Sequence, residues 1–112
     1  MIDVETGDLG EDAALLRPHG RLNMVLAPHL RDLVASTVAS GRSRLVVDLS
    51  GTEFVDSSGL GALVAGLKTA RQAGGDLRIA AAPEQVRTVL SLTNLDRVLR
   101  PHDTVEQALG DG

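Results

Sequence analysis

The strongest constraint on the fold is the segment Leu45-Val46-Val47-Asp48-Leu49, in which apolar and polar residues do not alternate. A strand with one face in water alternates, whereas a strand covered on both faces is almost continuously apolar. Strands of the second kind occur mainly in sheets that contain parallel strands and carry helices on their faces. The segment therefore predicts an α/β architecture with a strand buried under helices.

Shorter patterns predict the other strands. Apolar residues alternate with polar ones near the N-terminus, and Gly7–Asp12 is rich in turn residues, so a hairpin is expected there. Pro18 cannot donate to a ladder and should place the far end of this hairpin at an edge or a bend. The further expected strands are Ile2–Thr6, Ala13–Leu16, Asp76–Ala81 and Leu95–Leu99, with Phe54-Val55 as a short extended segment.

Helices are predicted between these strands. The first has Pro28 in its first turn and ends at Gly41, and one face carries Leu26, Leu30, Leu33, Val34 and Val38. The others are a helix from Ser57 to about Ala73 that Gly74-Gly75 stops, one opened by Pro83, and Asp103–Leu109, where Asp103 and Glu106 match a capping box. We expect one domain, residues 1–112, with a mixed sheet of about five strands and about four helices packed on it.

Composition excludes several classes of function. Phe54 is the only aromatic residue, which argues against recognition by stacking. The net charge of −4 argues against nucleic acid and anionic membranes as partners. Without cysteine there are no disulfides and no thiolate metal sites, and the acidic residues lack metal-loop spacing, so no metal and no cofactor is expected. Neither a secretory signal nor a membrane span is visible, which makes the cytoplasm the expected location.

The junction before the second helix, Asp56-Ser57-Ser58-Gly59, is the best candidate site, because functional groups gather where strands end and helices begin. Its simplest interpretation is an N-cap formed by Asp56 or Ser57. The helix behind it has one apolar stripe, Leu60, Leu63, Val64 and Leu67. Its opposite face is small and nearly neutral, with Ser58, Ala62, Ala65 and Thr69 flanked by Gly61 and Gly66. That face either packs against the chain's own helices or meets a partner protein.

These segments resemble the STAS domain of anti-sigma factor antagonists, such as the sporulation and stress-response anti-anti-sigma factors. The similarity rests on Leu45–Leu49, on Asp-Ser-Ser-Gly-Leu-Gly at positions 56–61, and on Gly74-Gly75 before a strand. Gly20-Arg21-Leu22-Asn23, Pro83 and Thr93-Asn94-Leu95 lie where that family has its other signature segments. The resemblance covers nearly the whole chain and implies the STAS fold.

The resemblance also implies a partner-switching function. In that family the unphosphorylated antagonist binds an anti-sigma factor that is also a serine kinase, which frees the sigma factor. The kinase phosphorylates the first serine of the motif, here Ser57, and a PP2C-type phosphatase removes the phosphate. The partner-contacting residues expected here are Asn23, Asp56, Ser58, Gly59, Gly61, Ala62, Ala65, Gly66 and Thr69. The family usually has Asp where this chain has Asn23, so one negative charge near Ser57 is missing.

The sequence also allows two other interpretations, an enzyme and a non-catalytic adaptor. Catalysis is disfavoured, since Val55 stands where a nucleophile elbow needs glycine, and His19, His29 and His102 lie in separate segments without a triad-like context. A non-catalytic STAS role without phosphorylation is the main alternative: an adaptor in a lipid-transport complex or a scaffold subunit in a stress-signalling assembly. The oligomeric state stays open, with a weak homodimer as one option.

Overall fold

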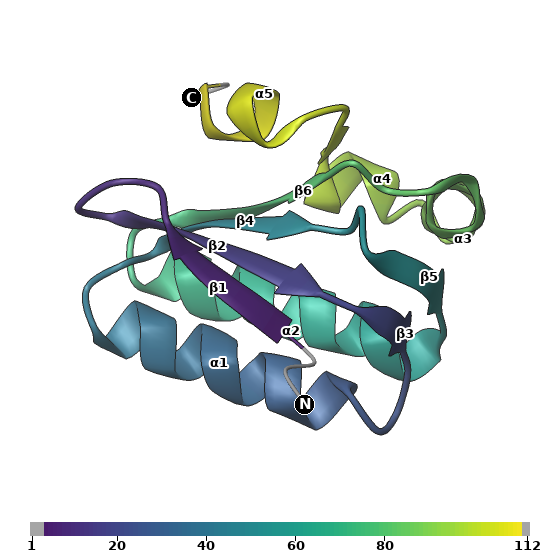
Figure 1. Ribbon diagram of the computed structural model, residues 1–112, viewed down its shortest axis with the longest axis horizontal. Helices are drawn as coiled ribbons and strands as arrows, with labels where there is room; N and C mark the ends of the chain where they lie inside the picture. The colour runs from purple at the N-terminus through teal and green to yellow at the C-terminus, as the bar shows by residue number, and fades with distance from the viewer. Residues whose placement is uncertain (1–3, 111–112) are drawn as a thin grey trace.

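The computed structural model describes residues 4–110 and has a mixed sheet with helices on both faces (Figure 1). The sheet has five strands in the order β1-β2-β4-β6-β7. Their bounds are β1 Val4–Asp8, β2 Ala13–Pro18, β4 Arg44–Asp48, β6 Asp76–Ala80 and β7 Pro101–His102. Only β1 and β2 are antiparallel; the other neighbouring pairs are parallel. The predicted STAS fold with a mixed sheet of about five strands is confirmed.

A second, two-stranded sheet continues the central strands toward the candidate site. It pairs β3 (Gly20–Leu22) with β5 (Thr52–Val55) in parallel. Both strands bend at the same level, where the Gly20 amide donates to the Gly51 carbonyl over 2.9 Å. Gly20 has a φ of +82°, which favours glycine at this bend. The sequence patterns did not predict β3, because three residues are too short to show alternation.

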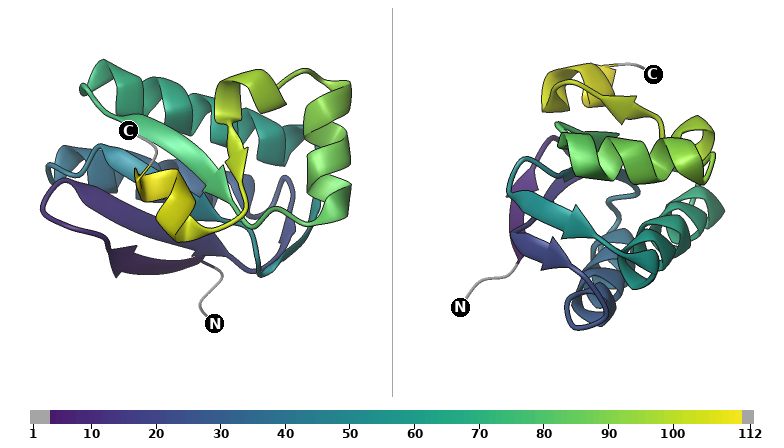
Figure 2. Two further views of the ribbon diagram at one scale, coloured as in Figure 1. Left: turned by 90° about the horizontal axis from the view of Figure 1, so that it is seen from above. Right: turned by 90° about the vertical axis from the view of Figure 1, so that its right-hand side faces the viewer.

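Five helices are present in residues 4–110: α1 Ala27–Ala39, α2 Ser57–Gln72, α3 Glu84–Leu92, α4 Asp96–Leu99 and α5 Val105–Gly110. Helices α1 and α2 lie side by side under one face of the sheet and run in the same direction, while α5 covers the other face (Figures 1 and 2). Helix α3 packs beside β5. The N-termini of α1 and α2 therefore lie at the same end of the molecule, next to β3 and β5.

The main core lies between the sheet and the pair α1 and α2. It is aliphatic, as the near absence of aromatic residues requires, and includes Leu16, Leu30, Val47, Leu63 and Ile79, each of which is fully or almost fully buried. A smaller cluster of Val46, Ala80 and Ala108 seats α5 on the opposite face. Strand β4 is thus covered on both sides, which confirms the buried strand predicted from Leu45–Leu49.

Two local predictions are wrong. Leu95–Leu99 is not a strand: Leu95, Val98 and Leu99 have helical spacing, the Leu99 amide donates to the Leu95 carbonyl over 2.8 Å, and the segment contains α4. Asp103 and Glu106 do not cap the last helix. One position later, the Thr104 hydroxyl accepts from the Gln107 amide, and the Gln107 side chain accepts from the Asp103 amide.

The N-terminal hairpin is confirmed, with Val4 paired to Pro18 and Asp8 paired to Ala14. Ile2 and Asp3 of the predicted first strand lie outside the described residues. Pro18 is the last residue of β2, where its missing amide does not interrupt the ladder.

Candidate site at the N-terminus of helix α2

The first turn of α2 presents Ser57 to solvent. Asp56 precedes the helix in an extended conformation, and its Oδ1 accepts a hydrogen bond from the Gly59 amide at 2.9 Å. Asp56 is therefore the N-cap, which is one of the two interpretations that the sequence left open. Ser57 is the first residue of the helix and is exposed, so its hydroxyl is accessible to another protein.

A close backbone approach joins this turn to β3. The Asp56 amide donates to the Leu22 carbonyl over 3.3 Å. A Cβ added to Gly59 would lie 2.2 Å from that same carbonyl oxygen and 2.8 Å from the Val55 side chain. The position therefore accepts no side chain, which is the local reason for a glycine in the Ser-Ser-Gly motif. Gly59 is buried and holds β3 against α2.

Asn23 follows β3 directly and lies next to the α2 N-cap, since the β-ladder pairs Leu22 with Val55. Its Oδ1 accepts from the amides of Val25 and Leu26, at 3.0 and 3.3 Å, and so fixes the loop that leads into α1. The structure thus brings two of the predicted site residues, Asn23 and Asp56, together across a parallel strand pair.

Two functional candidates that sequence reasoning missed are Met24 and Val25. They are 70% and 81% exposed, they directly follow Asn23, and because they are adjacent they form a small exposed apolar patch. The signal was available in the sequence as two adjacent apolar residues outside any helical or strand pattern. Together with Ser57 they put apolar and hydroxyl groups on one end of the molecule.

The structure divides the predicted contact face of α2. The apolar stripe is confirmed, because Leu60, Leu63 and Leu67 are buried and Val64 is partly buried against the core. Ala62 is fully buried, and a Cβ on Gly66 would lie 3.0 Å from Leu77 and 3.3 Å from Val34. Ala62, Gly66 and Gly59 therefore pack inside this chain, and assigning them to a partner contact is wrong. Half-buried residues of the same face remain predicted contacts: Ser58, Gly61, Ala65 and Thr69.

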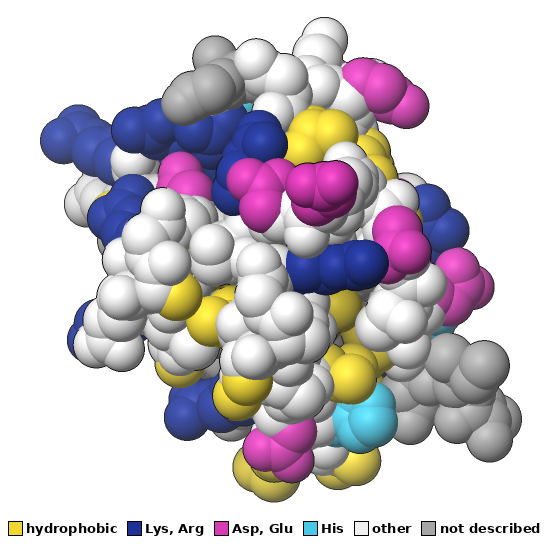
Figure 3. Space-filling view, turned by 90° about the vertical axis from the view of Figure 1, so that its left-hand side faces the viewer, with side chains coloured by type: hydrophobic (Ala, Val, Ile, Leu, Met, Phe, Trp, Pro, Cys, Tyr) yellow, Lys and Arg dark blue, Asp and Glu magenta, His cyan; other side chains and the backbone are white. Residues whose placement is uncertain are grey.

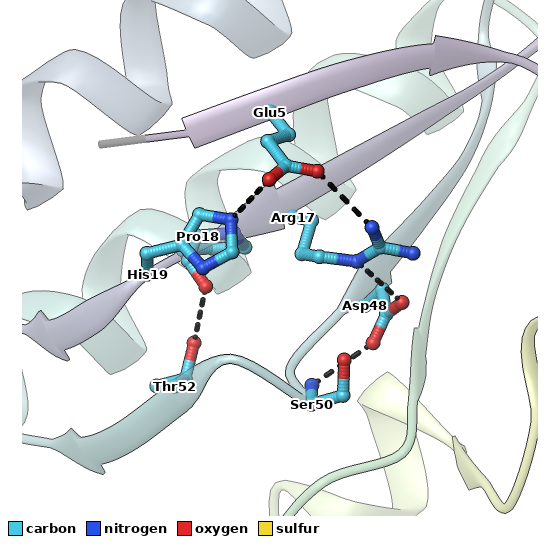
Figure 4. A network of polar contacts seen from close by, with 7 residues as sticks. All are labelled: Glu5, Arg17, Pro18, His19, Asp48, Ser50 and Thr52. Atoms are coloured by element: carbon cyan, nitrogen blue, oxygen red, sulfur yellow. Dashed lines mark hydrogen bonds and ion pairs between the residues drawn. The ribbon is translucent and has the colours of Figure 1, made fainter. Parts of the chain in front are cut away.

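A separate polar network connects β1, β2 and β4 (Figure 4). Arg17 donates from Nε to Asp48 at 2.8 Å and from Nη1 to Glu5 at 3.1 Å, and His19 Nε2 lies 2.9 Å from the other Glu5 oxygen. Burial of Asp48 acts to raise the pKa of its carboxyl, but hydrogen bonds from the Ser50 amide and hydroxyl, and from the Arg17 guanidinium, hold that pKa below its ordinary value. The only polar residue of the central run thus has a structural role.

Removing the Arg17 guanidinium should destabilise the fold in a pH-dependent way. A carboxyl with a depressed folded pKa stabilises the protein above its unfolded pKa, and this contribution is lost as pH falls through the folded value. We expect Arg17→Met to lower the free energy of unfolding by about 2 kcal/mol at pH 7 and by less at pH 3, which is below the ordinary pKa of a carboxyl, so that part of the contribution of Asp48 is lost. Urea unfolding at both pH values measures this.

Arg97→Met is the matched control, because Arg97 is exposed and has no ion pair within residues 4–110. It should change the free energy of unfolding little at either pH. An Arg17→Met deficit that is the same at pH 3 and pH 7 would contradict the role given to the charge on Asp48.

An arginine-lined cavity of about 510 Å³ lies at the other end of α2, beneath α5. Lys and Arg side chains gather on this side of the molecule, beside several acidic ones (Figure 3). Arg44 donates to the Leu109 carbonyl and Arg78 to the Ala108 carbonyl, while Arg71 pairs with Asp76. Arg44 and Arg78 thus dock the last turn of α5 on the sheet, so the cavity is best explained by the fold. It lies at the opposite end of α2 from Ser57.

Within residues 4–110, no three His, Asp or Glu side chains are grouped so that they could hold a metal ion. The same residues include no helix that is both long enough and apolar enough to cross a membrane.

Comparison with known proteins places this geometry in a family. The STAS domain model matches residues 7–108. The TM1081 homolog of Thermotoga neapolitana is 35% identical over 100 residues, which are 88% of each chain. The anti-sigma-F factor antagonist RsfB of Mycobacterium tuberculosis is 31% identical over 98 residues, covering 86% of this chain and 78% of RsfB. A crystal structure of an anti-sigma factor antagonist from Mycobacterium paratuberculosis superposes with a TM-score of 0.84 at 29% identity, over 96% of this chain and 91% of that one.

The family model matches residues 7–108, a range that includes nearly the whole sheet and the junction before α2. The chain belongs to the STAS domain family, among the anti-sigma factor antagonists.

Proposed function

We propose that this chain switches partners: unmodified, it binds an anti-sigma factor that is also a serine kinase and so releases a sigma factor, and phosphorylation of Ser57 ends that binding. A PP2C-type phosphatase would reset the switch. The chain itself performs no catalysis in this scheme and acts in the cytoplasm as one domain.

The observation that carries the proposal is the position of Ser57. Its exposed hydroxyl is in the first turn of α2, and the exposed side chains of Met24 and Val25 directly precede α1, whose N-terminus lies at the same end of the molecule (Figure 1). A kinase can reach such a hydroxyl without unfolding the domain. A partner that covers Met24 and Val25 would also cover Ser57.

Phosphate at this position is compatible with the fold but not with a close interface. It adds about −1.5 to −2 charge, and the first turn of a helix tolerates an anion, by roughly 0.3–1 kcal/mol, through its amides and its dipole. Against a partner, the same dianion would be desolvated beside the Asp56 carboxylate. A thousandfold loss of affinity corresponds to about 4 kcal/mol, which this desolvation can supply.

The proposal is tested by incubating the protein with an anti-sigma factor serine kinase from the same organism, together with ATP. Intact-mass analysis should show one added phosphate, and peptide mapping should place it on Ser57. Ser58→Ala should be modified as fast as the wild type, and Ser57→Ala not at all. Absence of modification, or modification at Ser58, would refute the switch and favour the adaptor or scaffold role.

A further inference from the structure

The side chain of Arg31 lies against α2 at Gly61, which is four residues after Ser57. Helices α1 and α2 run side by side in the same direction, and Arg31 and Gly61 are each the fifth residue of their helix (Figures 1 and 2). A Cβ added to Gly61 would lie 3.1 Å from Arg31 Nη2. The missing side chain at Gly61 is therefore what allows the guanidinium to rest on α2 at this level.

Gly61 lies one helical turn beyond Ser57 on the same side of α2. Residues four apart on a helix are neighbours, with Cβ atoms about 6 Å apart. A phosphate on Ser57 extends from the Cβ by several ångströms, and Arg31 is a long side chain with freely rotating bonds. The two groups can meet by a change of side-chain rotamer, without movement of either helix.

Arg31 also differs from most arginines of this chain in having no counter-ion. Within residues 4–110 it makes no ion pair and no side-chain hydrogen bond, and it is exposed. Six other arginines are paired with carboxylates: Arg17, Arg42, Arg44, Arg71, Arg78 and Arg87. The guanidinium next to the modification site is thus one whose donors are not already engaged.

We propose that Arg31 is the internal counter-ion of the phosphate on Ser57, an inference that rests on the proposed function. Guanidinium and phosphate form short, charge-assisted and often bidentate hydrogen bonds. The pairing would tie α1 to α2 in the modified protein. It would also turn the Arg31 side chain toward the phosphate and away from a bound partner. One modification would thus change the surface at both Ser57 and Arg31.

The test uses protein in which phosphoserine is incorporated at position 57 during translation, so that it does not depend on any kinase. In ¹⁵N–¹H spectra, the Arg31 Nε–Hε resonance should shift on phosphorylation, and that of Arg71 should not. In low salt, the change in Tm on phosphorylation should be about 3 °C less favourable for Arg31→Gln than for the wild type. Arg31→Lys, which keeps the charge but loses the planar fork, should restore part of this difference.

Arg71→Gln is the matched control. It removes the same charge from the other end of α2, about 21 Å along the helix axis from Ser57 and beyond the screening length of physiological salt. Its response to phosphorylation should equal that of the wild type. An unchanged Arg31 resonance, or an equal effect of phosphorylation on Tm in wild type and Arg31→Gln, would overturn the pairing. Failure of the kinase to modify Ser57 would instead contradict the proposed function and leave this measurement valid.

Discussion

Phosphorylation of Ser57 is expected to weaken binding of the anti-sigma factor about a thousandfold, the largest functional effect that a single change in this chain should have. Ser57→Ala should bind like the unmodified wild type and should stay bound when ATP is added, because no phosphate can form. Ser57→Asp should bind at least tenfold more weakly, since a single carboxylate reproduces only part of the charge and bulk of a phosphate. Titration calorimetry with and without ATP measures all three.

The binding surface can be tested apart from the phosphate. Val25→Asp puts a charge on a side chain that is 81% exposed, so it should leave the fold intact and weaken binding of the anti-sigma factor at least tenfold. Leu92→Asp is the control, because Leu92 is 79% exposed on α3 and lies outside the proposed surface. For the Ser57 variants, the switch is wrong if Ser57→Asp binds as tightly as the unmodified wild type and Ser57→Ala responds to ATP as the wild type does. Equal affinity of Val25→Asp and wild type would remove the Met24–Val25 loop from the interface.

Gly59→Ala is expected to cause the largest loss of stability among conservative substitutions at the site. The added methyl would meet the Leu22 carbonyl at 2.2 Å, and neither β3 nor α2 can move away without losing the contact between them. Overpacking of this kind typically costs 1–3 kcal/mol, and a backbone neighbour puts this case at about 3. The Tm of Gly59→Ala should therefore be about 10 to 20 °C lower than that of the wild type in a thermal melt.

Gly61→Ala is the matched control two residues further along the same helix. Its methyl would meet only the end of the flexible Arg31 side chain, at 3.1 Å, and alanine gains up to about 1 kcal/mol in helix propensity over glycine. Its Tm should be equal to or slightly above that of the wild type. Similar losses for both variants would show that a general effect of adding a methyl group to α2, and not the Leu22 contact, explains Gly59.

Local sequence patterns predicted an element correctly wherever its structure depends on residues within that one segment. Leu45–Leu49 predicted a strand that is buried on both faces, because apolar side chains follow one another along it instead of alternating with polar ones. Gly74-Gly75 predicted the end of α2, and the spacing of Leu60, Leu63 and Leu67 predicted its buried stripe. The same reasoning failed at Leu95–Leu99, where five residues with mixed apolar spacing fit a strand and a helical turn equally well until Leu99 is seen to be buried under a neighbouring element.

The candidate site was predictable in its chemistry and only partly in its geometry. The sequence by itself determined that Asp56 or Ser57 caps α2 and that one face of α2 beyond the cap is neutral, because capping and helical periodicity are local properties. The structure decided that Asp56 is the cap and that Ser57 is exposed. Only the tertiary structure decided which part of that neutral face is buried. Val34 and Leu77 come from distant segments and cover Gly66, and β3 closes over Gly59. Periodicity fixes the direction in which a side chain points, but which segment packs against it depends on contacts between residues far apart in the chain.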